Sequence, residues 1–398
     1  MNCYYSTHFA AATVGQSALN QRKGYGAGAN AGIKKQPAKH FRVLVTDSSF
    51  KHAIALARYL KRDIPDLHIT GHTGRWLNLG SMYSCFDETI SNIPLERAIR
   101  ENNFEMLIPV GANSVLSVSR LKPSLAVLPS VEQLEISYDK ASTIRFALNA
   151  GVPVPKTQVL VSVEQIVPQD ITYPCVVKAS REGVNRKVTY CHNLEETRRA
   201  VRGHLAVVEI RGASVLVQEF VPGEGYGLFA LMDHGRAVRV FMHHRLREDP
   251  PTGGQSTAAR AYFSEQLKEY GLRLLQALRW HGAAMVEFKL DSRSGQFVLM
   301  EINGKFWGSL ELALRSGINF GADLVRLYRG DTLQYCQEYD RHCHFYWPLD
   351  SDLRTIWKTR NFSAVRDYFK PDASTNVGQS LRADILKTGL LLWRLVQR

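Results

Sequence analysis

Residues 283–303, with the sequence AAMVEFKLDSRSGQFVLMEIN, carry two apolar runs that flank the turn-forming segment SRSGQ. This pattern predicts a β-hairpin in which side chains alternate between two faces. We expect three cross-strand pairs to form one apolar face. These pairs are Val286–Ile302, Phe288–Met300 and Leu290–Val298. A slip of one residue would place acidic side chains against core residues, so the apolar pattern itself selects this register.

The other face of the predicted hairpin is polar. Glu287 lies opposite Glu301, and Asn303 follows two residues further along the second strand. Two carboxylates directly across a strand pair repel each other, so we expect a cation between them. Two carboxylates and one amide oxygen suit Mg²⁺ or Mn²⁺. The alternative is an exposed polar sheet face on which Lys289 neutralises the acids.

The chain has 398 residues, of which 45% are hydrophobic, and this length favours two or three domains. Residues 1–40 are rich in Gly, Ala, Gln and Ser, and we expect a flexible tail. Residues 41–130 alternate strand-like runs (FRVLV, LHITGHT, FEMLIPVG, LAVLPS) with helical patterns, which favours a parallel α/β domain. Residues 131–330 contain mostly strands and hairpins, as in an antiparallel α+β region. Residues 331–398 are expected to form a helical extension.

Several classes of protein are disfavoured by the composition. No uninterrupted apolar run is long enough for a membrane span, and the first residues lack a secretory pattern, so we expect a cytoplasmic protein. The formal charge is +13, but it is spread along the chain without a dense basic stripe. We therefore expect no nucleic-acid partner, and a bound anion such as a nucleotide is the milder explanation.

The six cysteines are scattered without CxxC pairs, which favours reduced thiols over a disulfide framework. His342, Cys343 and His344 lie together near Cys336 and suggest a metal site at first sight. Adjacent ligands point to opposite faces of a strand, however, and no second ligand pair has zinc spacing. The sequence therefore disfavours a metal at this place.

Basic and acidic residues upstream of the hairpin are candidates for binding an anionic ligand. Lys140 opens a helix predicted over 138–149, and Lys178 ends the apolar strand YPCVVK. An ammonium at either position can reach phosphate oxygens as a point charge, although most lysines are only solvated. In QEFVPGEG, an extended backbone can bind the edge of a purine, and Glu219 and Glu224 can accept hydrogen bonds from an amine or from ribose hydroxyls.

Two arginines precede a stiff loop in the segment HHRLREDPPTGG. Arg245 and Arg247 each offer a guanidinium that can clamp a phosphate or a substrate carboxylate with two hydrogen bonds. Arg245 follows the apolar strand AVRVFM, so we expect it to face the reacting groups.

The segments GVPVPKT, QEFVPGEG, RLREDPPTGGQS and VEFKLD…MEINGKFWGSL occur in this order along the chain. Together they resemble the ATP-grasp superfamily, and most closely its carboxylate-amine ligase-like branch, which is related to the ATP-binding domain of carbamoyl-phosphate synthase. The resemblance spans residues 41–330. It implies an α/β plus α+β architecture, with a Rossmann-like pre-ATP-grasp domain followed by two α+β lobes that hold ATP.

The resemblance also implies roles for individual residues. Lys140 and Lys178 are expected to be the two lysines that bind ATP. Glu219 and Val221 are expected at the hinge that holds the adenine, and Glu224 at the ribose. Those expected to bind Mg²⁺ or Mn²⁺ are Glu287, Glu301 and Asn303. Arg245 and Lys305 are expected to act on the reacting groups. The resemblance thus implies a reason for the three polar groups on this strand: they hold the metal that holds ATP.

The activity implied is that of a ligase. ATP phosphorylates a carboxylate, and an amine attacks the acyl phosphate to leave an amide or peptide bond, ADP and phosphate. Carboxylation through carboxyphosphate is a rival among enzymes, and a non-catalytic nucleotide-binding or scaffold protein is a rival of another class. The sequence identifies neither the carboxylate nor the amine, and it does not give the oligomeric state.

This chain departs from the resemblance in two places. Related sequences usually have Asn-Pro-Arg where this one has Asn303, Gly304 and Lys305, so we expect a freer loop that lacks the forked guanidinium. The segment SREGVNRK after Lys178 is poor in glycine for a loop that covers phosphates.

The last segment, LRADILKTGLLLWRLVQR, predicts a basic helix with a broad apolar face. One face of this helix carries Leu381, Ile385, Leu392 and Val396. The long basic side chains that can extend to anionic lipid headgroups are Lys387, Arg394 and Arg398. We weigh two placements: a helix packed on the α+β lobes, and weak contact with a membrane surface or a protein partner.

Overall fold

The computed structural model describes residues 40–181, 183, 187–208, 212–250 and 253–396. The chain divides into two compact units, Met1–His40 and Phe41–Arg398, and the description below concerns the second. The tail predicted for residues 1–40 lies outside the described residues except for His40. The other domain boundaries proposed from the sequence, after residues 130 and 330, stay predictions.

The first sheet is parallel and has four strands in the order β3-β2-β1-β4. Its strands are β1 (Phe41–Val45), β2 (Leu67–Thr73), β3 (Glu88–Ser91) and β4 (Met106–Ile108). The helices that follow them are α1 (Lys51–Asp63), α2 (Leu95–Glu101) and α3 (Ala112–Leu121). Strand residues alternate between two cores: Val43 and Val45 pack with α1, whereas Leu44 packs with α2 and α3. A doubly covered parallel sheet of this kind confirms the α/β prediction.

The second sheet has seven strands in the order β13-β12-β9-β10-β11-β14-β15. All neighbours pair antiparallel except β14 and β15. Its strands are β9 (Gly223–Asp233), β10 (Arg236–Asp249), β11 (Gln255–Ala261), β12 (Gly282–Asp291), β13 (Phe297–Asn303), β14 (His344–Tyr346) and β15 (Ala373–Thr375). The helices that complete this region are α4 (Val131–Tyr138), α5 (Lys140–Asn149), α7 (Glu265–Ala277), α8 (Leu310–Arg315) and α9 (Phe320–Tyr328).

The two faces of the seven-stranded sheet belong to different cores. Phe229 and Phe241 pack with α1, α8 and α9 in the core that they share with the parallel sheet. Leu228 and Val240, one residue away on the same strands, pack with α7 and Trp280. This alternation places each strand residue on one face or the other, and it decides below which polar side chains can meet.

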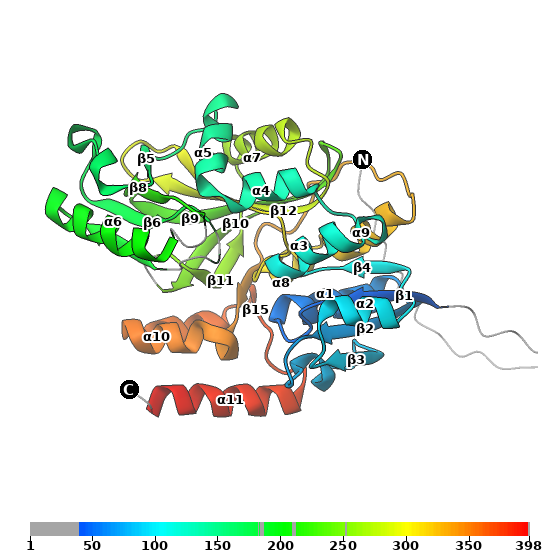
Figure 1. The fold of residues 1–398 in the computed structure, drawn as a ribbon. Coiled ribbons are helices and arrows are strands. Elements are labelled where there is room, and N and C mark those ends of the chain that lie inside the picture. Colours follow the sequence, from blue (N-terminus) through cyan, green and yellow to red (C-terminus); the bar gives the residue numbers. More distant parts are fainter. Residues whose placement is uncertain (1–39, 182, 184–186, 209–211, 251–252, 397–398) are drawn as a thin grey trace, which may run out of the picture. The chain divides into compact units, whose positions relative to one another are not determined.

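A third sheet, with strand order β5-β8-β6-β7, is antiparallel. Its strands are β5 (Thr157–Leu160), β6 (Cys175–Ala179), β7 (Val188–Cys191) and β8 (Val215–Glu219). The helix α6 (Leu194–Val208) covers one face, on which Cys175, Val177, Val215 and Val217 are buried. The other face therefore carries Val176, Lys178, Leu216 and Gln218. Figure 1 shows this sheet and α6 at one end of the region, in green.

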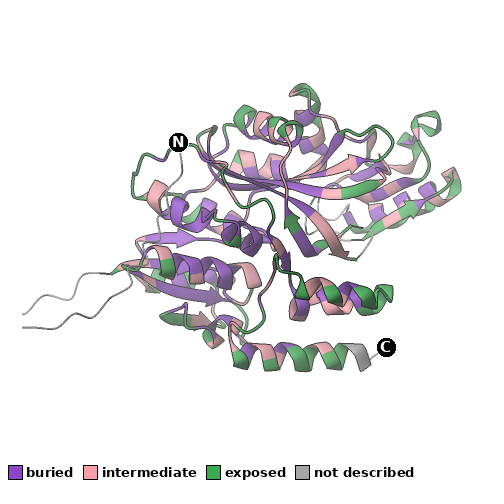
Figure 2. Ribbon diagram, turned by 180° about the vertical axis from the view of Figure 1, so that it is seen from behind, coloured by how far each residue is buried: buried purple, intermediate pink, exposed green. Residues whose placement is uncertain are grey.

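Residues 331–398 are less purely helical than predicted. They contain α10 (Leu353–Thr359) and α11 (Leu381–Val396), but also β14 and β15, which extend the seven-stranded sheet. In both views α10 and α11 run side by side (Figure 1). Figure 2 shows that α11 is largely exposed, whereas α10 is partly buried. No helix among the described residues is long and apolar enough to cross a membrane.

Two further sequence predictions need correction. The run LAVLPS does not form a strand; a short 3-10 turn at Pro123–Leu125 leads into α4, whose capping box at Ser130 was not recognised in the sequence. In the hairpin, Glu287 pairs with Glu301 and Val286 with Ile302 as predicted, but a β-bulge follows. Phe288 therefore pairs with Leu299, not with Met300, and Leu290 pairs with Phe297, not with Val298.

Candidate functional site

The β12–β13 hairpin brings the three predicted metal ligands together. The Asn303 amide nitrogen donates to Glu301 Oε1 over 2.8 Å and to Glu287 Oε1 over 3.2 Å. All three side chains are half-buried or buried, and the bulge that follows Glu287 bends the strand beside them. Rotation of the amide by 180° would turn its oxygen toward both carboxylates, because the two ends of an Asn side chain have nearly the same shape, and this oxygen would then no longer accept from Lys305. Two carboxylates and one amide are a donor set that fits a hard divalent cation.

The two carboxylates differ in their electrostatic surroundings. Burial raises the pKa of Glu287 to about 7; Arg245 acts against this increase, and the charge of Glu301 adds to it. Burial alone would also raise the pKa of Glu301, but Lys140, Asn303 and Lys305 outweigh it and lower that pKa. Glu301 is therefore the carboxylate that stays ionised, and a nearby cation would favour ionisation of Glu287 as well.

Two lysines face these carboxylates from different elements. Lys140 is the first residue of α5, and its Nζ lies 3.1 Å from Glu301 Oε2. Lys178 projects from the face of β6 that α6 leaves uncovered. Burial and the charges of Lys140 and Lys289, against that of Glu301, lower the pKa of Lys178 to about 8. Within the described part of the chain the Lys178 ammonium has no ion-pair partner, so its charge is available to an anion.

Arg245 lies on the same side of the seven-stranded sheet. Its Nη2 is 2.5 Å from Glu287 Oε2, and its Nη1 is 3.2 Å from both Glu248 Oε1 and the Gly254 carbonyl oxygen. Its Nε is buried and has no hydrogen-bond partner. Glu248 was not singled out in the sequence. Two irregularities in the β10–β11 pairing, between Arg245 and Glu248, bring this acid to the side of the strand that holds Arg245.

The loop after β13 supplies the second predicted catalytic residue. The Lys305 ammonium donates to the Asn303 amide oxygen over 2.7 Å. It also lies close to the start of α1, where burial, with the charges of Lys51 and Lys305, lowers the pKa of His52 to about 3. Gly304 is buried, and a Cβ there would lie 2.7 Å from Leu134 Cδ2 and 3.0 Å from the Trp280 ring. The prediction of a freer loop is therefore wrong: close packing explains the glycine.

The predicted hinge lies between β8 and β9. Val221 is buried, and its carbonyl oxygen accepts a hydrogen bond from Lys289 Nζ over 3.2 Å. The same ammonium lies 5.3 Å from the centre of the Phe220 ring. Lys289 therefore binds the hinge backbone. The alternative interpretation of the hairpin, in which Lys289 neutralises the paired acids, does not agree with this contact.

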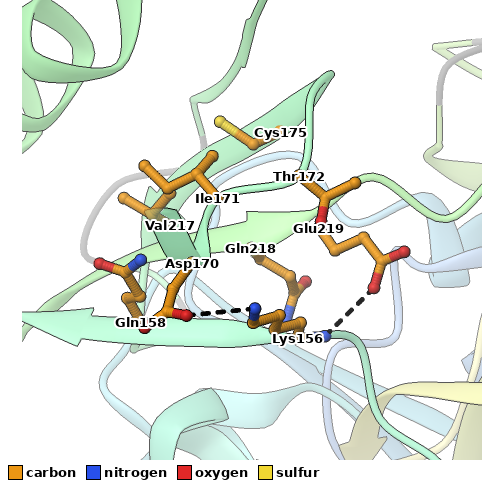
Figure 3. A pocket seen from close by; sticks show the side chains of 9 residues that line it. All are labelled: Lys156, Gln158, Asp170, Ile171, Thr172, Cys175, Val217, Gln218 and Glu219. Carbon is orange, nitrogen blue, oxygen red and sulfur yellow. Dashed lines mark hydrogen bonds and ion pairs between the residues drawn. The ribbon is translucent and has the colours of Figure 1, made fainter. Parts of the chain in front are cut away.

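The Glu219 side chain does not join this group. It alternates with Gln218 and lies on the α6 side of β8, where Arg293 Nη2 is 2.7 Å from its Oε1. Figure 3 shows it at the rim of a small pocket with Lys156, whose Nζ contacts Asp170 over 3.4 Å. This pocket opens on the face of the small sheet opposite to Lys178. Only the backbone of Glu219 remains a candidate for the hinge.

Glu224 also lies apart from the other predicted residues. On β9 it shares a face with Tyr226, whose ring stacks on His244 at 4.5 Å in the core beside α7. His244 Nε2 is 2.9 Å from the Glu224 carboxylate. Gly225 is the β9 residue on the Glu287 side, and a Cβ there would lie 2.7 Å from Glu248 Oε1. Glu248 is thus a carboxylate that reaches this part of the site, whereas the Glu224 side chain does not.

Two other sequence candidates have structural roles. Arg247 Nε and Nη2 bind both oxygens of the buried Asp352, at 2.9 and 2.7 Å, and its Nη1 binds Asp367 at 2.7 Å. It therefore attaches β10 to the C-terminal region. Near the disfavoured metal site, Cys343 is buried in the core and His344 Nδ1 lies 2.6 Å from Asp372.

No model of a protein family matches the chain. Among curated proteins, it is 24% identical to a D-aspartate ligase of Enterococcus faecium over 259 residues, which is 59% of this chain and 61% of that protein. It is also 24% identical to a putative urea carboxylase of Emericella nidulans over 222 residues, 50% of this chain and 17% of that one. The chain thus matches less than two thirds of the length of either relative.

The solved structures decide the fold. An N5-carboxyaminoimidazole synthetase from Staphylococcus aureus superimposes with a TM-score of 0.63 at 12% identity, covering 81% of this chain and 86% of the other. An L-amino acid ligase from Bacillus licheniformis superimposes with a TM-score of 0.60 at 15% identity, covering 75% and 77%. This chain has the ATP-grasp fold.

In the ATP-grasp fold of this chain, the seven-stranded sheet, the small antiparallel sheet and α5 converge on one polar group. Six of the ten residues predicted from the sequence have side chains in it or facing it. These are Lys140, Lys178, Arg245, Glu287, Glu301 and Asn303. Lys305 joins them through Asn303, and Val221 contributes its backbone. The side chains of Glu219 and Glu224 lie elsewhere, and Glu248 and Lys289 take part instead.

Proposed function

We propose that the protein is an ATP-dependent ligase that joins a carboxylate to an amine through an acyl phosphate and releases ADP and phosphate. The observation that carries the proposal is the clustering of Glu287, Glu301 and Asn303 with Lys140 and Arg245. This group combines oxygen donors for Mg²⁺ with cations for phosphate. The ligases among the similar proteins support the proposal at the level of the fold.

In this proposal, Glu287, Glu301 and the amide oxygen of Asn303 hold Mg²⁺ or Mn²⁺. When bound, the metal neutralises phosphate charge and orients the terminal phosphate. Lys178 and Lys140 bind phosphate oxygens as point charges, and the backbone at Glu219 and Val221 binds the adenine. The Val221 carbonyl oxygen accepts from Lys289 through one lone pair and has a second lone pair for the adenine amine.

Arg245 and Lys305 are proposed to act on the reacting groups. An oxygen of the substrate carboxylate attacks the γ-phosphorus, and the bond from that phosphorus to ADP breaks. The amine nitrogen then attacks the acyl carbon, the bond from carbon to the phosphate oxygen breaks, and the amine loses a proton. Arg245, with Nε unpaired, has a donor left for the transferred phosphate or the carboxylate.

The test is a screen of paired acids and amines for release of ADP, with mass spectrometry of the product. An ADP-forming reaction that requires both an acid and an amine, and gives their condensation product, supports the proposal. Release of ADP that depends on bicarbonate and gives a carboxylated amine favours the carboxylation rival, because ADP alone does not separate the two. Nucleotide binding without any turnover across the screen favours a non-catalytic protein.

A second proposal concerns α11 and rests on its exposure. Its first half is attached to the protein: Ala383 is buried, and Lys387 Nζ lies 3.1 Å from Asp350. Leu381, Ile385 and Leu392 lie on the opposite side of the helix and are 76%, 65% and 58% exposed. Lys387 is thus not available to lipid headgroups, contrary to the sequence prediction; Val396 lies in a segment whose side chains are not described.

We propose that this exposed stripe, defined by Leu381, Ile385 and Leu392, contacts the surface of an anionic membrane reversibly. Trp393 beside it is 57% exposed and has the amphipathic ring that suits the membrane interface. Arg382 and Arg394 are exposed on the same helix, and its one acid, Asp384, accepts from the Gly378 backbone nitrogen.

A cytoplasmic location, where ATP is available, also stays a proposal.

A further inference from the structure

A cluster of two histidines and one aspartate lies outside the site described above. Asp233 is the last residue of β9, His234 lies in the turn between β9 and β10, and His281 immediately precedes β12. One ligand atom from each of the three side chains lies within 4.8 Å of the other two. It is the one group of this kind among the described residues, and no sequence motif indicates it because His281 lies far along the chain from the adjacent pair Asp233 and His234.

The backbone fixes the positions of the three residues. His234 and Gly235 have φ of 48° and 91°, values that close a tight hairpin turn. Gly282 pairs with Met232, which places His281 beside the turn across the β9–β12 pairing. The Gly235 nitrogen donates to the Trp280 carbonyl oxygen over 2.8 Å and ties the two segments together.

The side chains leave the atoms that a metal needs. The His234 and His281 rings are stacked, with centroids 4.0 Å apart and planes inclined by 10°. Asp233 Oδ1 lies 3.7 Å from His281 Nδ1, while Arg236 holds the other carboxylate oxygen at 2.9 Å. His281 Nδ1 also accepts a long hydrogen bond, over 3.4 Å, from the His234 backbone nitrogen, and a metal ion bound at this atom would replace that contact.

We propose that Asp233, His234 and His281 form a binding site for a transition-metal dication such as Zn²⁺. Imidazole ligands favour Zn²⁺, Cu²⁺ or Ni²⁺ over Mg²⁺, which prefers oxygen ligands. In a tetrahedral zinc site ligand atoms lie roughly 3.4 Å apart, given metal–ligand bonds of about 2.0–2.1 Å, so the three atoms must approach by about 1 Å. Tilting the exposed His234 ring out of the stack brings this about, and a fourth position remains for water.

The expected role of the ion is structural. It joins the β9–β10 turn to the segment that enters β12, and β12 carries Glu287 six residues further on, roughly 20 Å away at 3.3 Å per residue. The site is therefore separate from the proposed Mg²⁺ site. We expect Zn²⁺ to raise the melting temperature, because binding to the native state alone stabilises it.

The experiment is titration of the full chain with Zn²⁺ by calorimetry, in excess Mg²⁺ so that the carboxylate site is occupied. We expect one equivalent to bind and the melting temperature to rise. His281→Ala and His234→Ala are expected to weaken binding at least tenfold. His192→Ala, which removes an exposed histidine elsewhere, is the matched control and is expected to bind Zn²⁺ as the wild type does.

Circular dichroism of each variant shows whether it is folded, and Asp233→Asn provides a conservative third variant of nearly equal volume. Co²⁺ gives an independent readout, because its visible absorption reports the number and kind of ligands. Equal Zn²⁺ affinity in the wild type, His281→Ala and His234→Ala would overturn the proposal. So would a Co²⁺ spectrum that the two histidine substitutions leave unchanged, or binding that only Glu301→Gln abolishes.

Discussion

The Arg245 guanidinium lies 2.5 Å from the Glu287 carboxylate, so a residue proposed to act on the substrate contacts one proposed to hold the metal. Arg245 also contacts Glu248 and the Gly254 carbonyl oxygen. Three acceptors from three segments fix the plane of the guanidinium. A forked donor held in this way can orient a phosphate or a carboxylate in a way that an ammonium cannot.

We therefore expect Arg245→Lys to reduce ligation far more than ATP binding. The lysine keeps the charge beside Glu287 but loses the fork, and we expect the rate of product formation to fall by about 100-fold or more, a size usual for a lost donor to transition-state charge. Single-turnover kinetics and nucleotide titration measure the two effects separately. Equal losses in both would instead assign Arg245 to the nucleotide site.

Glu301→Gln tests the metal ligands. Glutamine keeps the volume and one amide oxygen, but it removes the charge that pairs with Lys140 and that a divalent cation needs. We expect ATP turnover to be lost and the Mg²⁺ dependence of nucleotide binding to disappear, with the circular dichroism spectrum unchanged. Glu164→Gln, at an exposed position, serves as the control. Wild-type turnover with unchanged Mg²⁺ dependence would refute the assignment.

Lys178 makes nucleotide binding depend on pH. Its pKa is lowered to about 8, so its charge is present at pH 7 and mostly lost at pH 9. If only the charged form binds phosphate, the affinity for ATP falls by about tenfold between these values. Lys178→Arg keeps its charge at both, and we expect its affinity to change little over the same range. Lys178→Ala is expected to bind weakly throughout.

Unfolding does not explain such a loss of affinity. Because the pKa of Lys178 is lower in the native state than in the unfolded state, the unfolded state binds more protons between pH 8 and pH 10.5. The free-energy cost of burying the Lys178 charge therefore falls as the pH rises through that range, and the native state becomes more stable with respect to this residue. A parallel fall of ATP affinity in wild type and Lys178→Arg would show that another group titrates.

The ligands of the β12–β13 hairpin could be predicted because one face of it is apolar. With Val286 and Ile302 buried, the register follows, and with it the pairing of Glu287 and Glu301. The prediction failed one residue later, at the bulge before Phe288. Apolar residues stand on both sides of the bulge, so the sequence pattern reads the same with or without it.

The same limit explains the misplaced acids. Alternation along a regular strand places Arg245 and Arg247 on one side and Glu248 on the other, but irregular pairing in β10 reverses this. Glu224 was chosen from the spacing of a loop motif, whereas its side chain follows the alternation of β9 toward Tyr226. Spacing along the chain locates a segment, but the face that a side chain occupies depends on the strand pairing.

Gly304 offers a test of packing. An added Cβ would lie 2.7 Å from Leu134 and 3.0 Å from the Trp280 ring, both buried. We expect Gly304→Ala to lower the free energy of unfolding by about 1–3 kcal/mol, as overpacking usually does. Gly308→Ala is the control, because a Cβ there would meet Lys51 Cε at an ordinary 3.6 Å. Urea denaturation of both variants decides, and equal stability would show that the loop yields at no cost.

The exposed stripe of α11 can be tested without removing the helix. Truncation after Ser380 would also remove the buried Ala383 and the ion pair between Lys387 and Asp350. A loss of membrane binding by the truncated chain could then not be separated from a loss of stability. Ile385→Asp with Leu392→Asp changes two largely exposed side chains, so we expect the melting temperature to stay the same. The charges oppose burial in lipid, and we expect the variant to lose sedimentation with anionic vesicles.

Val161→Asp, at another exposed apolar position, is the matched control and is expected to sediment as the wild type does. Because the stripe is short and its flanking charges few, we expect binding to be reversible and to weaken with added salt. If wild type and the double variant both stay in the supernatant, the membrane proposal fails. Light scattering then distinguishes the remaining occupants: a dimer that the double variant disrupts would show that the stripe binds a second copy of the chain.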